Sequence, residues 1–97
     1  MHRLVVPREI QEVIRKMHPD LKKKVKASLK MILSDPHSGK ELMDDLSALR
    51  SFRVGSFRII YRIENPEQIE LVAIGPRARI YEITFRLVRK KKGVKER

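Results

Sequence analysis

The chain has 97 residues, with 23 Lys and Arg against 12 Asp and Glu, which gives a formal net charge of +11 at pH 7. This length accommodates one modest hydrophobic core. Cysteine is absent from the sequence, which excludes disulfides, cysteine-based zinc sites and thiol nucleophiles and fits a reducing compartment. Self-repulsion among so many like charges opposes the folded state, so the excess charge implies a use and predicts an anionic partner.

Targeting and metal signals are weak along the whole sequence. The first ten residues, MHRLVVPREI, hold an apolar run too short for a signal-peptide core, and no stretch approaches the roughly 20 apolar residues of a membrane span. We therefore expect a cytoplasmic protein with no membrane partner. The histidines are far apart and lack metal-binding spacing, so no metal site and no cofactor are expected.

The first half of the chain predicts a strand and then a helical hairpin. Residues 2–6 form a short β-branched run, and Pro7 suits the first turn of a helix. Apolar residues at helical spacing follow and end at the break between His18 and Pro19. Asp20 is the expected cap of a second helix with one apolar stripe and lysine-rich wet faces. Residues 34–40, SDPHSGK, stop that helix, and residues 41–49 form an acidic loop that is expected to fold over the core.

From Arg50 the apolar period changes from 3.6 to 2. Gly55 and Ser56 form a two-residue turn suited to a tight type II′ hairpin between two antiparallel strands. A third strand at residues 69–74 is apolar on both parities apart from Glu70, as in the interior of a sheet. With the first strand on one edge of this meander and the helical hairpin on one face, the pattern predicts an α+β fold whose other sheet face is free.

The C-terminal segment leaves its conformation open. Tyr81, Ile83, Phe85 and Leu87 alternate as in a strand, while residues 80–88 also satisfy a helical stripe. Residues 89–97 form a basic tail that is expected to be frayed or disordered. We therefore expect a single domain over residues 1–97 with this tail at its end.

Arginines gather around the predicted hairpin. Strand alternation puts Arg58 and Arg62 on the sheet face away from the helices. Guanidinium binds phosphate oxygens bidentately and stays charged, whereas the lysines of the second helix suit general attraction. The alternative is a set of solvated strand charges. Five guanidiniums could converge on one surface: Arg50, Arg53, Arg58, Arg77 and Arg79.

Two segments carry a family resemblance: LRSFRVGSFRIIY at residues 49–61 and IGPRARIYE at residues 74–82. With the helical hairpin and the SDPHSGKEL segment before them, they resemble the RelE/ParE superfamily of toxins from prokaryotic toxin–antitoxin pairs. The resemblance covers nearly the whole chain and implies a RelE-like, microbial ribonuclease-type fold. The RelE branch consists of endoribonucleases that cut mRNA in the ribosomal A site without a metal, while the ParE branch inhibits DNA gyrase and lacks the ribonuclease residues.

Cleavage by the RNA 2′-OH needs a base, charge for the phosphorane and an acid for the leaving oxygen. By resemblance, Arg58 holds the scissile phosphate, Arg77 stabilises the transition state or donates the leaving-group proton, and Tyr81 is the general base. Arg53 adds charge where the family often has lysine. Tyr81 could instead be a packing residue, and the shorter spacing here could shift these roles by a position. Tyr61 is expected in the core and His37 in an exposed loop.

Charge predicts further contacts and the partners. The resemblance implies a cognate antitoxin, and the basic C-terminal segment would contact either ribosomal RNA or that acidic antitoxin. The resemblance thus implies a ribosome-dependent mRNA endonuclease. The alternatives are a ParE-like gyrase inhibitor and an inactive relic that binds only nucleic acid or antitoxin. The expected RNA-contacting residues are Arg50, Arg62, Arg79, Lys22, Lys23, Lys26, Arg86 and Arg89.

Overall fold

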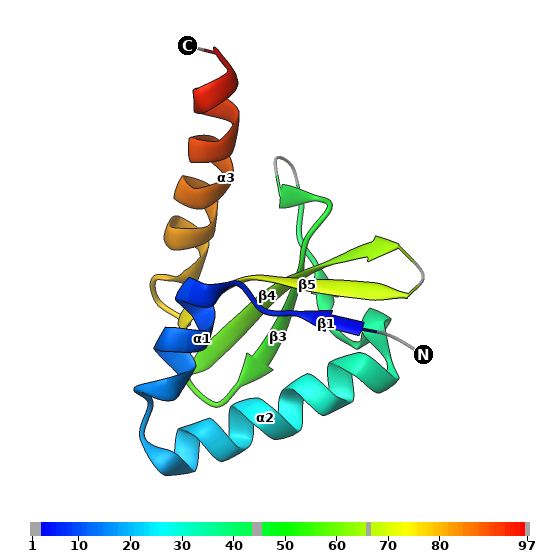
Figure 1. The fold of residues 1–97 in the computed structure, drawn as a ribbon, viewed down its shortest axis with the longest axis vertical. Coiled ribbons are helices and arrows are strands. Elements are labelled where there is room, and N and C mark those ends of the chain that lie inside the picture. The colour runs from blue at the N-terminus through cyan, green and yellow to red at the C-terminus, as the bar shows by residue number, and fades with distance from the viewer. Residues whose placement is uncertain (1–2, 44–45, 66, 97) are drawn as a thin grey trace.

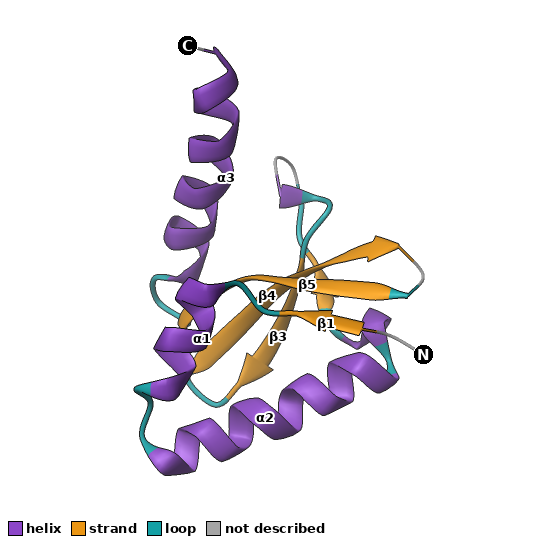
Figure 2. Ribbon diagram, viewed as in Figure 1, coloured by secondary structure: helices purple, strands orange, loops and turns teal. Residues whose placement is uncertain are grey.

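The computed structural model describes residues 3–43, 46–65 and 67–96, and for residues 90–96 the backbone alone. Its described strands form one sheet of order β1-β5-β4-β3-β2, with helices outside it (Figures 1 and 2). This arrangement confirms the predicted α+β class. The elements are β1 Arg3–Val5, α1 Arg8–Arg15, α2 Pro19–Ser34, the 3-10 turn η1 Pro36–Ser38, β2 Lys40–Glu41, β3 Arg50–Val54, β4 Phe57–Asn65, β5 Gln68–Pro76 and α3 Ile80–Glu96.

The helical hairpin forms as predicted, but its caps differ from the expected ones. His18, not Asp20, is the N-cap of α2, because its Nδ1 accepts a hydrogen bond from the Asp20 backbone N–H at 3.2 Å. Pro19 then occupies the first helical position, where its missing N–H removes no hydrogen bond. Pro7 lies one residue before α1 instead of inside its first turn, and its carbonyl accepts from the first turn of that helix.

The meander and its pairing with the first strand are confirmed. β3 and β4 are antiparallel and joined at Gly55, whose φ of 59° lies in the left-handed region that glycine favours. β1 pairs in parallel with β5, which makes β5 an interior strand. A short edge strand, β2, was not predicted and pairs antiparallel with β3.

The sheet is buried on both faces, so the prediction of a free second face is wrong. On one face α1 and α2 cover a cluster that includes Ile59 and Leu71, while on the other α3 covers Ile60 and Ala73. A bulge at Val72 shifts the register of β5, since Ile60 pairs with Ala73 but Tyr61 pairs with Leu71. Apolar residues on both parities of β5 therefore reflect two covering layers.

The segment from Ile80 forms a helix. Of the two apolar periods that its sequence fits, the helical one and not the strand one is therefore realised. Ile80 and Thr84 are fully buried against the sheet, whereas Tyr81 is 41% exposed. α3 continues to Glu96 through the segment expected to fray, and Arg97 lies outside the described residues. Its second half extends beyond the rest of the molecule (Figure 1).

The loop after β2 folds over the core, as expected. Leu42 and Leu46 pack against the cluster beneath α3, and Leu49 within that cluster is 4% exposed. The acidic pair at 44–45 lies outside the described residues. The spacing of the leucines at residues 42, 46 and 49 was therefore enough to predict a loop that packs on the core.

Candidate phosphate-binding site

Arg53 and Arg58 lie side by side on the sheet face that α3 covers. They are directly opposed partners in the β3–β4 hairpin, which is fixed in register by its two-residue turn. Arg53 is exposed, and Arg58 is half-buried. The Nη1 of Arg58 donates to the Ser51 Oγ at 3.2 Å. Sequence reasoning missed Ser51, although its parity already placed it on the same face as these arginines.

Arg77 follows at the same end of the sheet. Its backbone N–H donates to the Ser56 carbonyl at 2.7 Å, which ties the end of β5 to the hairpin turn. The end of β5 also lies beside Arg58, because Gly75 is the β5 partner of Arg58 in the sheet. Arg77 and Arg79 are both exposed. The structure therefore brings the polypeptide at Arg53, Arg58 and Arg77 to one end of the sheet.

Tyr81 stands in the first turn of α3, immediately after this end of the sheet. Ile80 anchors that turn, because its Cδ1 lies 3.3 Å from the position that a Cβ on Gly75 would occupy. Tyr81 exposes 41% of its surface, whereas Ile80 and Thr84 of the same helix are fully buried. Burial in the core is therefore not what requires an aromatic residue here.

Arg50 is on the opposite face, so the expected convergence of five guanidiniums is wrong at this position. Arg50 and Phe52 share a parity on β3, and Phe52 packs in the cluster beneath α1 and α2. The Arg50 Nη1 donates to the Gly39 carbonyl at 2.6 Å and to the His37 carbonyl at 3.4 Å. The side chain thus holds the turn after α2.

Tyr61 completes the attachment of this turn. Its hydroxyl donates to the Pro36 carbonyl at 2.6 Å and accepts from the Gly39 N–H at 3.0 Å. The residue is fully buried, which confirms its expected place in the core. Burial raises the pKa of the Tyr61 phenol, while the Gly39 hydrogen bond and the Arg50 charge act in the opposite direction. His37 is exposed, as expected.

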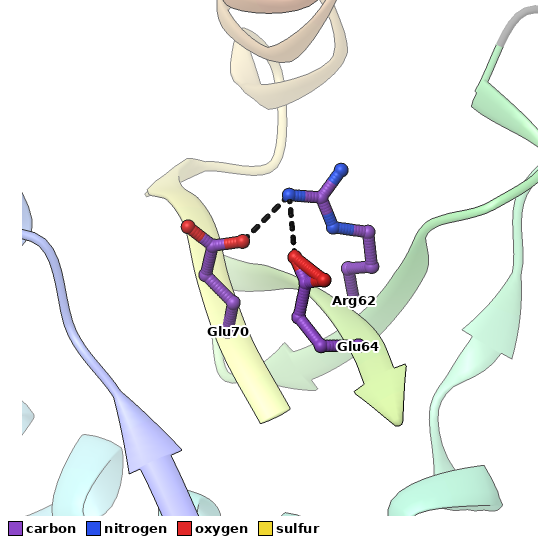
Figure 3. Close-up of polar contacts among 3 residues, drawn as sticks. All are labelled: Arg62, Glu64 and Glu70. Atoms are coloured by element: carbon purple, nitrogen blue, oxygen red, sulfur yellow. Dashed lines mark hydrogen bonds and ion pairs between the residues drawn. The ribbon is translucent and has the colours of Figure 1, made fainter. Parts of the chain in front are cut away.

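Arg62 shares the sheet face of Arg58 but has carboxylate partners. Its Nη2 lies 2.6 Å from Glu70 Oε1 and 3.0 Å from Glu64 Oε2 (Figure 3). The hydrogen bond that Arg62 donates to Glu70 is the largest influence on the pKa of Arg62 and raises it, against the opposing effect of burial. The charge is therefore balanced locally, and Arg62 is a poor candidate for the predicted RNA contact.

The remaining predicted RNA contacts lie on two separate helices. Lys22, Lys23 and Lys26 belong to α2, across the sheet from Arg58. On α3, Arg86 pairs with Glu82 at 3.3 Å. The Arg89 guanidinium lies 5.6 Å from the centroid of the Phe85 ring. No single surface can therefore include all of them.

The described residues form neither a metal site nor a membrane-spanning helix. In residues 3–43, 46–65 and 67–96, no three His, Asp or Glu side chains gather in a way that could hold a metal ion. Within the same ranges, no helix combines the length and apolar content that crossing a membrane requires.

Comparison with known proteins identifies the family. A family model described as the ParE toxin of type II toxin–antitoxin systems, parDE, matches residues 8–81. The match spans most of the chain, so the protein belongs to this family of type II toxins, which confirms the resemblance to the RelE/ParE superfamily. No curated protein matches the sequence.

Solved toxin structures share the fold. A variant of Escherichia coli RelE with two arginines replaced by alanine, in the free state, superimposes with a TM-score of 0.73 at 14% identity, covering 93% of this chain and 96% of that one. A RelBE toxin–antitoxin complex from Mycobacterium tuberculosis gives a TM-score of 0.68 at 19% identity, covering 77% and 96%. The intact E. coli RelBE complex gives 0.67 at 15% identity, covering 78% and 96%.

Proposed function

We propose that this toxin is an endoribonuclease that cleaves mRNA on the ribosome. The observation that carries the proposal is the opposed pair Arg53 and Arg58 beside the backbone of Arg77. None of the ion pairs among the described residues includes these three arginines. Guanidiniums that no described carboxylate pairs with suit a phosphate whose negative charge increases in the transition state.

The proposed reaction uses the RNA's own 2′-hydroxyl. Tyr81 takes the proton of that hydroxyl, and the 2′-oxygen forms a bond to the adjacent phosphorus while the bond from phosphorus to the 5′-oxygen breaks. The leaving 5′-oxygen takes a proton from water, so the products are a 2′,3′-cyclic phosphate and a 5′-hydroxyl. Arg58 binds the phosphate, Arg53 adds charge, and Arg77 stabilises the phosphorane and the leaving oxygen.

We further propose an acidic antitoxin as the regulatory partner. The net charge of +11 favours both ribosomal RNA and an acidic protein. RelE in the solved complexes is bound to RelB, which supports the same kind of partner here. Binding of either anion over the arginines would exclude the other, so the antitoxin would act by occupying the RNA surface.

Cleavage by the purified toxin on translating ribosomes tests the proposal. Primer extension on the translated mRNA should find cuts that depend on the toxin. Arg58→Ala and Arg77→Ala should each lower the cleavage rate about a hundredfold or more, the loss typical of removing one transition-state donor. Tyr81→Phe should do likewise, because it removes the hydroxyl and keeps the ring.

Arg15→Gln is the matched control, since Arg15 is an exposed arginine of α1 that pairs with Glu12. This variant should cleave at the wild-type rate. Full cleavage by Arg58→Ala, Arg77→Ala and Tyr81→Phe alike would show that the assigned residues do not perform the reaction.

A second candidate function is inhibition of DNA gyrase, and the specific observation in its favour is that the matching family model is that of ParE. Supercoiling of relaxed plasmid by purified gyrase tests it directly. Blocked supercoiling together with intact mRNA would replace the ribonuclease proposal by this one.

A further inference from the structure

Ser51 is a buried hydroxyl on the α3 face of β3. The residue is 3% exposed, and its strand partner is Ile60, which belongs to the apolar cluster beneath α3. A hydroxyl is unfavourable in such surroundings unless it is hydrogen-bonded. Its hydrogen bond therefore matters to both stability and placement.

The partner of this hydroxyl is Arg58, whose Nη1 donates to the Ser51 Oγ at 3.2 Å. The Nε of Arg58 is buried, and no described atom accepts a hydrogen bond from it. The inner part of the side chain is thus enclosed, and the terminal nitrogens are the atoms that can reach a ligand. Ser51 fixes the orientation of that terminal group.

The charges around Arg58 explain why it matters that its hydrogen-bond acceptor, the Ser51 hydroxyl, is uncharged. Arg53 is its opposed partner and repels it, whereas Arg62, four residues along the same strand, is held by two carboxylates. A carboxylate at the position of Ser51 would hold Arg58 more strongly but would cancel its charge. A hydroxyl holds the guanidinium and leaves that charge available to a phosphate.

We propose that Ser51 is a positioning residue that orients Arg58 toward the RNA phosphate. The inference rests on the proposed role of Arg58 in RNA cleavage. A long side chain that is already held loses less conformational freedom when it binds its ligand, so the hydrogen bond favours RNA binding without touching the RNA.

RNA affinity in a double-mutant cycle tests the proposal. The probe is a fluorescent single-stranded RNA with 2′-O-methyl groups, which cannot undergo attack by a 2′-hydroxyl. Ser51→Ala should weaken its binding about tenfold, and Ser51→Thr, which keeps the hydroxyl, should stay within about threefold of the wild type. In an Arg58→Ala background, Ser51→Ala should have no further effect, because the group that it positions is gone.

Ser28→Ala is the matched control. Ser28 is also a buried serine, at 8% exposure, and its hydroxyl donates to the Lys24 carbonyl within α2. This variant removes a buried hydroxyl on the other side of the sheet and leaves the arginines untouched. It should bind the RNA with wild-type affinity.

A second measurement separates this inference from the proposed function. Rotation of the Arg58 guanidinium about its Nε–Cζ bond, followed by ¹⁵N NMR, should accelerate severalfold in Ser51→Ala. If Arg58→Ala leaves RNA binding and cleavage unchanged, the proposed function fails, while accelerated rotation still supports the positioning contact. Unchanged rotation, unchanged affinity of Ser51→Ala, or an equal loss in the Arg58→Ala background would each overturn the positioning role.

Discussion

At the scale of single residues, Tyr61 shows how a side chain far along the sequence fixes a turn. Its hydroxyl joins the Pro36 carbonyl and the Gly39 N–H, and Arg50 holds the Gly39 carbonyl. Gly39 is required for this approach, because a Cβ there would lie 2.5 Å from the Tyr61 hydroxyl oxygen. The turn between α2 and β2 is therefore specified by packing against β4 as well as by its own residues.

Stability at high pH should report on this buried phenol. The folded-state pKa of Tyr61 is raised, so the folded state keeps the proton more tightly than the unfolded state. The stabilisation is fully present below the unfolded value of about 10 and is lost as pH rises through the folded pKa. Denaturant unfolding should therefore show stability falling more steeply above pH 10 in the wild type than in Tyr61→Phe.

Tyr61→Phe should also lower the free energy of unfolding at pH 7 by about 1 to 3 kcal/mol, because the Gly39 N–H and the Pro36 carbonyl lose their buried partner. Parallel pH profiles for the two proteins would contradict the assigned burial of the hydroxyl.

At the scale of elements, α3 covers and buries the second face of the sheet. Its buried residue Ile80 packs with Ile60 and Ala73 in a cluster separate from the one beneath α1 and α2. The same helix positions Tyr81 at the end of the sheet. Docking of α3 and the geometry of the candidate site are therefore coupled through the first turn of the helix.

Ile80→Ala should loosen α3 more than the rest of the fold. Removing a fully buried isoleucine costs about 2 to 5 kcal/mol where the cavity does not close. Hydrogen exchange should lose protection along α3 while the amides of α2 change less, since α2 packs on the other cluster. Equal loss of protection in α2 and α3 would show that the two layers unfold as one unit.

At the scale of the whole molecule, positive charge lies on both sides of the sheet. The lysines of α2 are on the face opposite to Arg58, and Figure 1 shows α2 and α3 leaving the sheet in different directions. A partner that uses both surfaces must extend around the molecule. Under the proposed function, a large folded RNA meets that requirement better than a short strand that fits one surface.

Changing Lys22, Lys23 and Lys26 together to glutamine should weaken RNA binding in a salt-dependent way. If each lysine neutralises one phosphate of the RNA, the slope of log affinity against log salt should become shallower by about 2 to 3. Ribosome binding measured over a range of salt concentrations checks this. An unchanged slope would place the α2 lysines outside the RNA interface.

Much of the fold could be predicted from local pattern. The Gly55 turn, the change from helical to strand period at Arg50 and the apolar run of β5 determined the hairpins and the layer of α1 and α2. The sequence could not decide the conformation of residues 80–88, because the residues there satisfy both periods. That choice depends on the apolar sheet face formed by Ile60 and Ala73, which only the folded chain presents.

The candidate site, like the fold, could be predicted only in part from the sequence. The sequence alone identified the arginines as candidate phosphate ligands and, through strand alternation, placed Arg58 and Arg62 on the face away from α1 and α2, whereas the pairing of Arg53 with Arg58 came from the register of the folded hairpin. Only the tertiary structure decided that Arg50 turns to the Gly39 carbonyl and that Arg62 is paired with two carboxylates. The physical reason is that an arginine's charge is fixed by its chemistry, whereas its availability depends on the acceptors that distant segments bring to it.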